Sequence, residues 1–249
     1  MIKKLFTFWK KKEKPKIHWW SVIDGVEKVT PIVPAREYVP DWWKRVERVI
    51  ENNVDTKLTN KGTIRNCPSF PEYLTQGFVV PLWCDVNMII DDGKFEWQTP
   101  DRTFSFSSHA DSQFRDHLPQ HVKDNTSMVM KPVCPWRVKT PPGWSVWQLP
   151  MYYHYNPYFE TLPGIIWSDI HHEINQQMVM KRYGEFTIKR GTPLAMYVPY
   201  ERNKYTYDIQ GPNDENAKWS NESFIHVRSK FKGGYKLHQA EVKKCPVKH

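Results

Sequence analysis

The sequence lacks the cysteine spacing of a zinc site. Its four cysteines, Cys67, Cys84, Cys134 and Cys245, form no Cys-x-x-Cys pair and have no histidine pair at zinc-finger spacing. Structural zinc sites use those spacings, so we expect no zinc site and cysteines that stay reduced.

Long hydrophobic runs are also missing. No apolar stretch approaches the roughly 18 residues that a membrane-spanning helix needs. The apolar run near the basic start, Leu5 to Trp9, is shorter than the hydrophobic region of a secretory signal. We therefore expect a soluble, intracellular protein without a membrane span.

Several catalytic motifs are absent as well. The sequence has no Gly-x-x-x-x-Gly-Lys loop, no Gly-x-Ser-x-Gly elbow and no zincin helix, which mark nucleotide triphosphatases, hydrolases and metalloproteases. It has instead 20 prolines against 11 glycines, and 14% of its residues are aromatic. This composition favours a β-rich protein with many loops, and the aromatic side chains supply enough apolar area for a core.

The net charge of +9 is concentrated at the two ends. Residues 1–16 contain seven lysines and one glutamate, and residues 226–249 contain seven Lys or Arg and one glutamate. The residues between them are slightly acidic. We therefore predict that the basic termini, rather than a groove across the body, contact an anionic partner such as nucleic acid. For the arm at 1–16 the alternatives are a solvated terminus, a segment whose aromatic residues dock on a partner protein, and weak binding to an acidic membrane.

Periodicity predicts a small number of helices and many short strands. Asp41 is expected to cap a helix that runs to about Asn52, and residues 68–77 are expected to form a helical turn. Residues 78–90 predict one buried strand, followed by a hairpin turn at Asp91-Asp92-Gly93 into a strand at 94–98. Short strands then follow one another up to residue 209, and residues 213–231 predict a helix.

These elements predict a mainly β (α+β) fold, a β-clip or a jelly-roll-like barrel with flanking helices. Four segments are expected along the chain. They are a basic N-terminal arm at 1–16, an α+β half at 17–125, a β-clip-like module at 126–210, and a C-terminal helix with a basic tail at 211–249.

The module at 126–210 resembles the dUTPase-like β-clip. The resemblance rests on Pro142-Gly143-Trp144, Gly164-Ile165-Ile166-Trp167-Ser168-Asp169 and Ile188-Lys189-Arg190-Gly191-Thr192-Pro193-Leu194, which match in order and rough spacing. In that family the first aspartate of an Asp-x-Asp pair positions the attacking water. Here Trp167 stands at that place, only Asp169 remains, and the Arg-Ser-Ser and glycine-rich phosphate segments have no match.

The β-clip resemblance implies a nucleotide-binding or nucleotide-hydrolysing enzyme, and such proteins commonly form trimers with shared pockets. Asp169 would then be the catalytic residue, with Arg137 or Arg190 on the phosphates. Because an indole replaces the carboxylate that holds the water, we favour a protein without catalytic activity or cofactor and keep this enzyme as the alternative.

A longer pattern resembles an uncharacterised protein family encoded by tailed bacteriophages. It consists of Gly77-Phe78-Val79-Val80-Pro81-Leu82-Trp83-Cys84-Asp85, Thr140-Pro141-Pro142-Gly143-Trp144-Ser145 and Val198-Pro199-Tyr200-Glu201-Arg202. The family brings no established activity with it. Together with the basic ends, the aromatic-rich face and the absence of an intact active-site motif, the resemblance leads us to expect a structural or assembly protein located in the virion or the host cytoplasm. Its partners would be other phage proteins or further copies of itself, including a trimer.

A third alternative is a jelly-roll oxygenase that uses Fe(II) and 2-oxoglutarate. His109-Ala110-Asp111, followed by His171 and Arg182, has the spacing of a two-histidine, one-carboxylate iron site with an arginine for the co-substrate. The competing interpretation is that these histidines lie in surface loops, and we predict no metal site.

Aromatic residues are the main candidates for binding. The segment from Tyr152 to Phe159 offers stacking surface for a base or a sugar, but it lacks interleaved Lys or Arg and equally suits a contact with a neighbouring subunit. The predicted binding residues are Trp144, Tyr152, Tyr153, Tyr155, Trp167 and Arg190.

Overall fold

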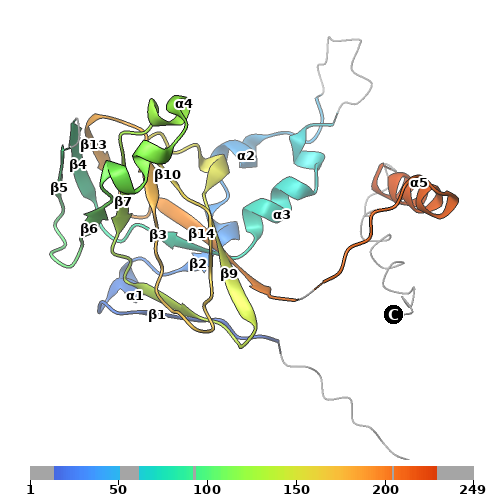
Figure 1. Ribbon diagram of the computed structural model, residues 1–249, viewed down its shortest axis with the longest axis horizontal. Helices are drawn as coiled ribbons and strands as arrows, with labels where there is room; N and C mark the ends of the chain where they lie inside the picture. The colour runs from blue at the N-terminus through green and yellow to red at the C-terminus, as the bar shows by residue number, and fades with distance from the viewer. Residues whose placement is uncertain (1–13, 51–61, 92–93, 204, 229–249) are drawn as a thin grey trace, which may run out of the picture. The chain divides into compact units, whose positions relative to one another are not determined.

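The computed structural model describes residues 14–50, 62–91, 94–203 and 205–228 (Figure 1). The chain divides into two compact units, Met1–Asn203 and Lys204–His249. The basic arm before residue 14 and the basic tail after residue 228 lie outside the described residues.

The described residues of the first unit form four antiparallel sheets. The largest has five strands in the order β11-β9-β14-β3-β2. Its strands are β2 (Val33–Pro34), β3 (Phe78–Pro81), β9 (Trp144–Leu149), β11 (Gly164–Ile166) and β14 (Pro193–Glu201).

The other three sheets are smaller. A four-stranded sheet has the order β10-β12-β7-β6, with β6 (Phe106–Ser108), β7 (Met128–Pro132), β10 (Phe159–Thr161) and β12 (Met178–Met180). A three-stranded sheet has the order β13-β4-β5, with β4 (Val86–Asp91), β5 (Lys94–Gln98) and β13 (Gly184–Ile188). The last sheet pairs β1 (His18–Ser21) with β8 (Trp136–Lys139).

Short helices flank these sheets. They are α1 (Val26–Val29), η1 (Ala35–Tyr38), α2 (Asp41–Arg45), η2 (Ile64–Asn66), α3 (Ser69–Thr75), η3 (Asp111–Gln113), η4 (Arg115–His117), α4 (Gln120–Lys123) and η5 (Tyr152–His154). The prediction of a mainly β fold with flanking helices is therefore confirmed.

Strands from both halves of the first unit pair with one another. Antiparallel β3 and β14 are neighbours, with Met196 opposite Val79, and antiparallel β4 and β13 are neighbours, with Phe186 opposite Met88. The segments 17–125 and 126–210 thus contribute strands to the same sheets.

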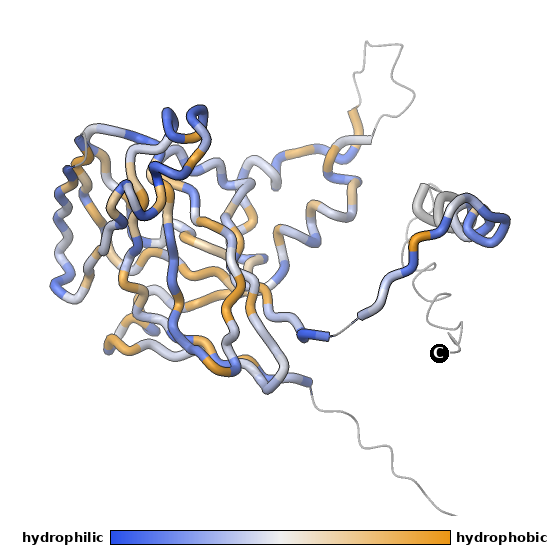
Figure 2. Tube along the Cα trace, viewed as in Figure 1, coloured by the Kyte–Doolittle hydropathy of each residue, from blue (hydrophilic) through white to orange (hydrophobic). Residues whose placement is uncertain are grey.

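The hydrophobic core follows the alternation of side chains along β14. Tyr197 and Ala195 face the main core, to which all four sheets contribute side chains. Met196, between them, points to the opposite face of the sheet and packs with Val79 and Ala35. Because neighbouring residues of a strand point to opposite faces, the five-stranded sheet is apolar on both sides. Figure 2 shows the hydrophobic positions along these strands.

Gly77 allows α3 to meet β14. Its φ of +68° lies in the left-handed region, and a Cβ atom at this position would lie 2.2 Å from the carbonyl oxygen of Tyr197. Only glycine accepts both conditions without strain. The predicted helical turn over 68–77, ended by Gly77, matches α3.

The helix predicted from Asp41 to Asn52 is wrong beyond Arg45, where α2 ends. Nη1 of Arg65 donates hydrogen bonds to the carbonyl oxygens of Lys44 and Val46, at 3.0 and 2.6 Å. These bonds satisfy acceptors at the end of the helix, so the chain can leave the helical conformation there. Val49 then forms a β-bridge with Gly62.

The strand predicted over residues 78–90 consists of two strands in different sheets, β3 and β4. The chain bends between Leu82 and Asp85, directly after Pro81, which ends β3. The predicted hairpin is confirmed, because β4 and β5 pair antiparallel and Asp91 lies opposite Lys94; Asp92 and Gly93 of the predicted turn lie outside the described residues.

The second unit contains α5 (Asp214–Arg228), which confirms the helix predicted after residue 213. Its described part is largely hydrophilic (Figure 2). The pattern predicts that Ala217, Phe224, Val227 and Phe231 face inward along this helix. The prediction is wrong for Ala217, which is exposed, and the other three lie outside the described side chains. Within the described ranges, no helix has the length and apolar character needed to cross a membrane.

Candidate functional site

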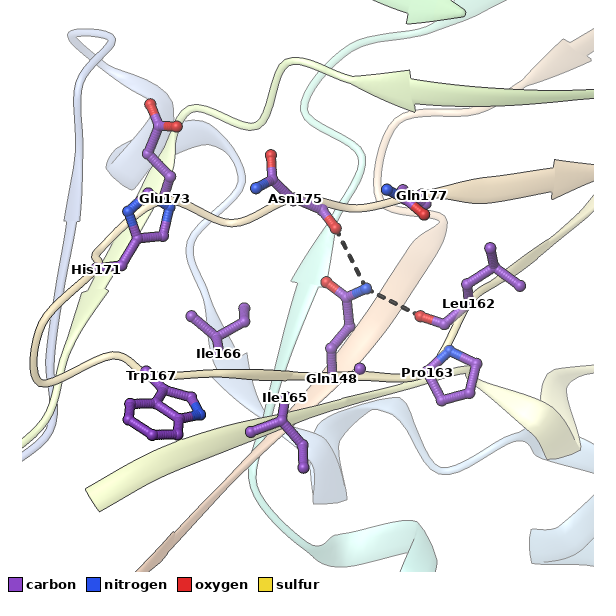
Figure 3. Close-up of a pocket in the computed structure, with 11 residues that line it drawn as sticks. Gln148, Leu162, Pro163, Ile165, Ile166, Trp167, His171, Glu173, Asn175 and Gln177 are labelled. Atoms are coloured by element: carbon purple, nitrogen blue, oxygen red, sulfur yellow. Dashed lines mark hydrogen bonds between the residues drawn. The ribbon is translucent and has the colours of Figure 1, made fainter. Parts of the chain in front are cut away.

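A pocket of about 400 Å³ lies between β11 and the extended segment that follows the turn at Trp167 (Figure 3). One wall is mostly apolar and the other is mostly polar. The lining residues are Gln148, Leu162, Pro163, Gly164, Ile165, Ile166, Trp167, His171, Glu173, Asn175 and Gln177.

The polar wall comes from alternate residues of an extended segment. His171, Glu173, Asn175 and Gln177 line the pocket, whereas Ile174 and Gln176, which alternate with them, are buried. Neighbouring residues of an extended chain point to opposite sides, so a period of two separates the pocket side chains from the core side chains.

Gln148 fixes the floor of the pocket. Its Nε2 donates to the carbonyl oxygens of Leu162 and Asn175, at 2.9 and 3.4 Å, and thereby connects the two walls (Figure 3). Its Oε1 accepts a hydrogen bond from the hydroxyl of Tyr197. Burial raises the pKa of that hydroxyl well above its usual value, so Tyr197 remains a neutral donor.

Both ends of the pocket are closed by backbone hydrogen bonds. The amide of Leu162 donates to the carbonyl of Gln177 at 2.8 Å, and the amide of His171 donates to the carbonyl of Trp167 at 2.8 Å. The pocket is therefore bounded at its two ends but open to solvent, and its volume is at the low end for ligand sites.

The pocket lining offers hydrogen-bonding groups on its polar wall. Its lining contains no Ser, Thr, Cys or Lys. Its one carboxylate, on Glu173, accepts a hydrogen bond from Nη2 of Arg137 at 3.2 Å. The amides of Asn175 and Gln177 and the imidazole of His171 offer donors and acceptors to a polar ring.

Asp169, the alternative catalytic residue, is outside this lining and is held by Arg202. Nη1 of Arg202 donates to its Oδ1 at 2.9 Å, Nη2 of Arg202 donates to its Oδ2, and the amide of Gly143 donates to Oδ2 at 2.9 Å. These donors, the Arg202 guanidinium above all, lower the pKa of Asp169. A carboxylate with both oxygens occupied and a lowered pKa is a poor general base.

Trp167 and Trp144 both contact Arg202. The guanidinium carbon of Arg202 lies 4.5 Å from the ring centroid of Trp167, which is 57% exposed. The carbonyl oxygen of Trp144 accepts a hydrogen bond from Nη1 of Arg202 at 3.0 Å. The indole that replaces the expected carboxylate therefore covers an arginine.

The predicted tyrosines form a separate aromatic cluster with residues of α2 and α3. The ring of Tyr153 lies 5.1 Å from that of Phe70 and 5.3 Å from that of Tyr73. Tyr152 and Tyr155 are more than half exposed. The structure thus places one tyrosine in an internal contact and two at the surface.

Arg190 lies apart from these residues, in the turn between β13 and β14. Its backbone amide donates to Oδ1 of Asp85 at 2.7 Å, and its side chain lines a second pocket of about 400 Å³ together with Tyr38 and Glu37. Its guanidinium makes no hydrogen bond or ion pair with the described residues.

The structure does not bring together the residues of the predicted iron site. His109 follows β6, Asp111 forms an ion pair with Arg115, and His171 lies at the pocket. Across the described part of the chain, no three His, Cys, Asp or Glu side chains gather where they could hold a metal ion. His109, Asp111 and His171 therefore do not form a metal-binding cluster in this fold.

Sequence reasoning missed Arg202 and the polar wall of the pocket. From His171 to Gln177 only Ile174 is apolar, so the sequence shows no polar-apolar alternation that would mark this wall. Arg202 gave no signal either, because its partner Asp169 is 33 positions away in the chain.

No protein-family model, curated protein or solved structure matches this chain. The resemblances to a tailed-bacteriophage family and to the dUTPase-like β-clip therefore stay predictions.

Proposed function

We propose that this chain is a bacteriophage-encoded structural or assembly protein that acts through its surfaces rather than by catalysis. The observation that carries the proposal is that hydrogen bonds already occupy the carboxylate of Asp169. The one carboxylate that the β-clip resemblance offers as a catalytic group is occupied by Arg202 and Gly143.

An exposed apolar surface supports the same proposal. On one face of the five-stranded sheet, Ile165 lies opposite Trp147 in the strand register, and both are at least 40% exposed. The ring of Trp147 lies 5.6 Å from the ring of Tyr200 on the adjacent strand. Contiguous apolar side chains at a surface mark protein contacts. The partners would be other virion proteins or further copies of this chain.

Quantitative mass spectrometry of purified virions tests the proposal. We expect the protein in a fixed number of copies per particle, and its absence from particles contradicts the proposal. Ile165→Lys should reduce the incorporated copies by placing a charge on the contact surface. Ile89→Lys is the matched control, because Ile89 is a comparably exposed isoleucine on β4.

A second candidate function, nucleotide binding without hydrolysis, is favoured by the pocket beside β11. That pocket includes Gly164–Ile166 of the β-clip-like motif, and it has amide groups opposite an apolar wall. The apolar wall can pack against the flat face of a base, and the amide groups can form hydrogen bonds with its polar edge.

Calorimetry with a panel of ribonucleotides and deoxyribonucleotides tests this candidate. Gly164→Phe should abolish binding, because a Cβ at Gly164 meets no atom within 4 Å and the ring would fill the pocket. Ile89→Phe is the control, because Ile89 is an exposed isoleucine on β4 that does not line this pocket. No heat with any nucleotide, or equal binding by both variants, removes the candidate.

A further inference from the structure

Three aromatic rings, those of the partly buried Trp42 and the exposed Tyr152 and Tyr155, form a surface cluster that we call the aromatic rim. The ring centroids of Trp42 and Tyr155 lie 5.9 Å apart, and those of Tyr152 and Tyr155 lie 6.1 Å apart. Tyr152 is 56% exposed and Tyr155 is 61% exposed. The rim thus presents a wide aromatic surface to solvent.

The residues behind the rim hold it in place. Nε1 of Trp42 donates a hydrogen bond to the carbonyl oxygen of Tyr153 at 2.8 Å, which ties α2 to η5. The hydroxyl of Tyr73 in α3 donates to the carbonyl oxygen of Pro150 at 2.8 Å. A surface that is ordered before a ligand arrives loses less entropy on binding.

The backbone of Tyr155 is in an unfavourable conformation. Its φ and ψ are both 48°, in the left-handed region. Within the described residues, every other positive φ belongs to a glycine. A bulky residue in this region is strained, and such strain concentrates at functional sites. The strained turn places the ring of Tyr155 on the rim.

A cavity of about 120 Å³ lies beside the two tyrosines, with Asn156, Glu160 and Lys181 among its lining residues. It is far smaller than the roughly 300 to 1,000 Å³ of a drug-sized site, so it holds a single ring or substituent.

Polar groups around the cavity remain available to a ligand. Oδ1 of Asn156 accepts hydrogen bonds from the amides of Tyr158 and Phe159. This leaves the amino group of the Asn156 side chain to donate. Glu160 and Lys181 are 4.0 Å apart in a loose ion pair. The hydroxyls of Tyr152 and Tyr155 make no hydrogen bond within the described residues.

The chemistry of these groups suits an uncharged ligand rich in hydroxyls. The negative face of an aromatic ring attracts the C–H hydrogens on one face of a sugar ring. Glu160 and Lys181 carry opposite charges, so together they accept from and donate to hydroxyl groups without selecting for a charged ligand. A nucleic acid would instead require an excess of positive charge for its phosphates, and the carboxylate of Glu160 opposes this.

We propose that the aromatic rim and its cavity form a carbohydrate-binding site. One sugar unit stacks on Tyr152 and Tyr155 and places its hydroxyls against Asn156, Glu160 and Lys181. The proposal is independent of the assembly function and of the pocket beside β11.

The test begins with the full-length protein on an array of immobilised mono- to hexasaccharides. Calorimetry then measures the affinity for the sugar with the strongest signal. Tyr155→Gly removes one ring and leaves a residue that adopts the left-handed conformation without strain, so the fold is retained. We expect the affinity of this variant to fall at least about tenfold, because stacking on one aromatic ring contributes on that order. Glu160→Gln should weaken binding as well.

Tyr183→Gly is the matched control, because Tyr183 is a comparably exposed tyrosine away from the rim. Its affinity should equal that of the unchanged protein, and circular dichroism should give the same spectrum for both variants. The proposal is overturned if no saccharide binds, or if binding is unchanged in folded Tyr155→Gly. It is also overturned if nucleotides bind at the rim and saccharides do not.

Discussion

The hydroxyl of Tyr197 donates a hydrogen bond to Oε1 of Gln148 at 3.0 Å, and both side chains are buried. This bond connects β14 with the floor of the pocket beside β11. It joins the hydrophobic core to the candidate site, because Gln148 also holds the two pocket walls together.

The first prediction concerns this bond. Tyr197→Phe leaves Oε1 of Gln148 buried without its donor, so the free energy of unfolding should fall by about 1–3 kcal/mol. Urea-induced equilibrium unfolding measures the change. Tyr200→Phe is the control, because the hydroxyl of Tyr200 makes no hydrogen bond within the described residues. Equal losses for the two variants would contradict the prediction.

A second prediction separates two effects at glycines with positive φ. Gly143→Ala should lower the free energy of unfolding by about 1–2 kcal/mol, the ordinary cost of a left-handed residue. Its φ is +82°, but a Cβ there meets no atom within 4 Å. Gly77→Ala should cost more, because its Cβ would also collide with the Tyr197 carbonyl. Thermal unfolding of both variants checks the order, and a smaller loss for Gly77→Ala would refute it.

The third prediction is a pH dependence that arises from Asp169. Its pKa in the folded state is lowered by Arg202 and Gly143. The ionised carboxylate therefore stabilises the fold above its unfolded pKa of about 3.9, and this contribution is lost as the pH falls through the lower folded value. Asp169→Asn should be less stable than the unchanged protein at pH 7, and the difference should shrink in acid.

Chemical unfolding at a series of pH values between 7 and 3 measures this difference. Asp116→Asn serves as the control, because the Asp116 carboxylate makes no ion pair or hydrogen bond within the described residues. The prediction fails if the two variants show the same pH profile.

The fourth prediction concerns thiol reactivity. Burial raises the pKa of Cys134 to about 12 and also raises the pKa of Cys84, whereas Cys67 is exposed. The thiolate is the reactive species, so Cys67 should be alkylated by iodoacetamide at pH 8 long before Cys84 and Cys134. Peptide mass spectrometry after short labelling times identifies the modified residues. Modification of Cys134 at the rate of Cys67 in folded protein would contradict the prediction.

Local signals in the sequence predicted local structure well. The hairpin at Asp91 and the helical turn ended by Gly77 depend on turn chemistry within a few residues, and both are present. The helix from Asp41 shows the opposite case. Its apolar spacing favoured a longer helix, but Arg65 occupies carbonyl groups at its end from far along the chain.

The candidate site was harder to predict because its contacts join distant residues. Trp42 and Tyr153, which tie α2 to the aromatic cluster, are separated by 111 positions. A sequence pattern indicates that Trp42 is apolar and that Tyr153 is aromatic, but it does not indicate which residues they contact. Asp169 illustrates the same limit, since only the fold reveals its pairing with Arg202.

Arg202 also has a mechanical consequence. The first compact unit ends at Asn203, one residue after this arginine. The backbone amide of Arg202 donates to the carbonyl of Gly143, and its guanidinium is fastened to Asp169 and to Oγ of Ser145. A tensile force applied through the second unit would therefore load these bonds before β14 could be peeled from its neighbours. Arg202 thus fastens the C-terminal end of β14 at the point where such a force would reach the five-stranded sheet.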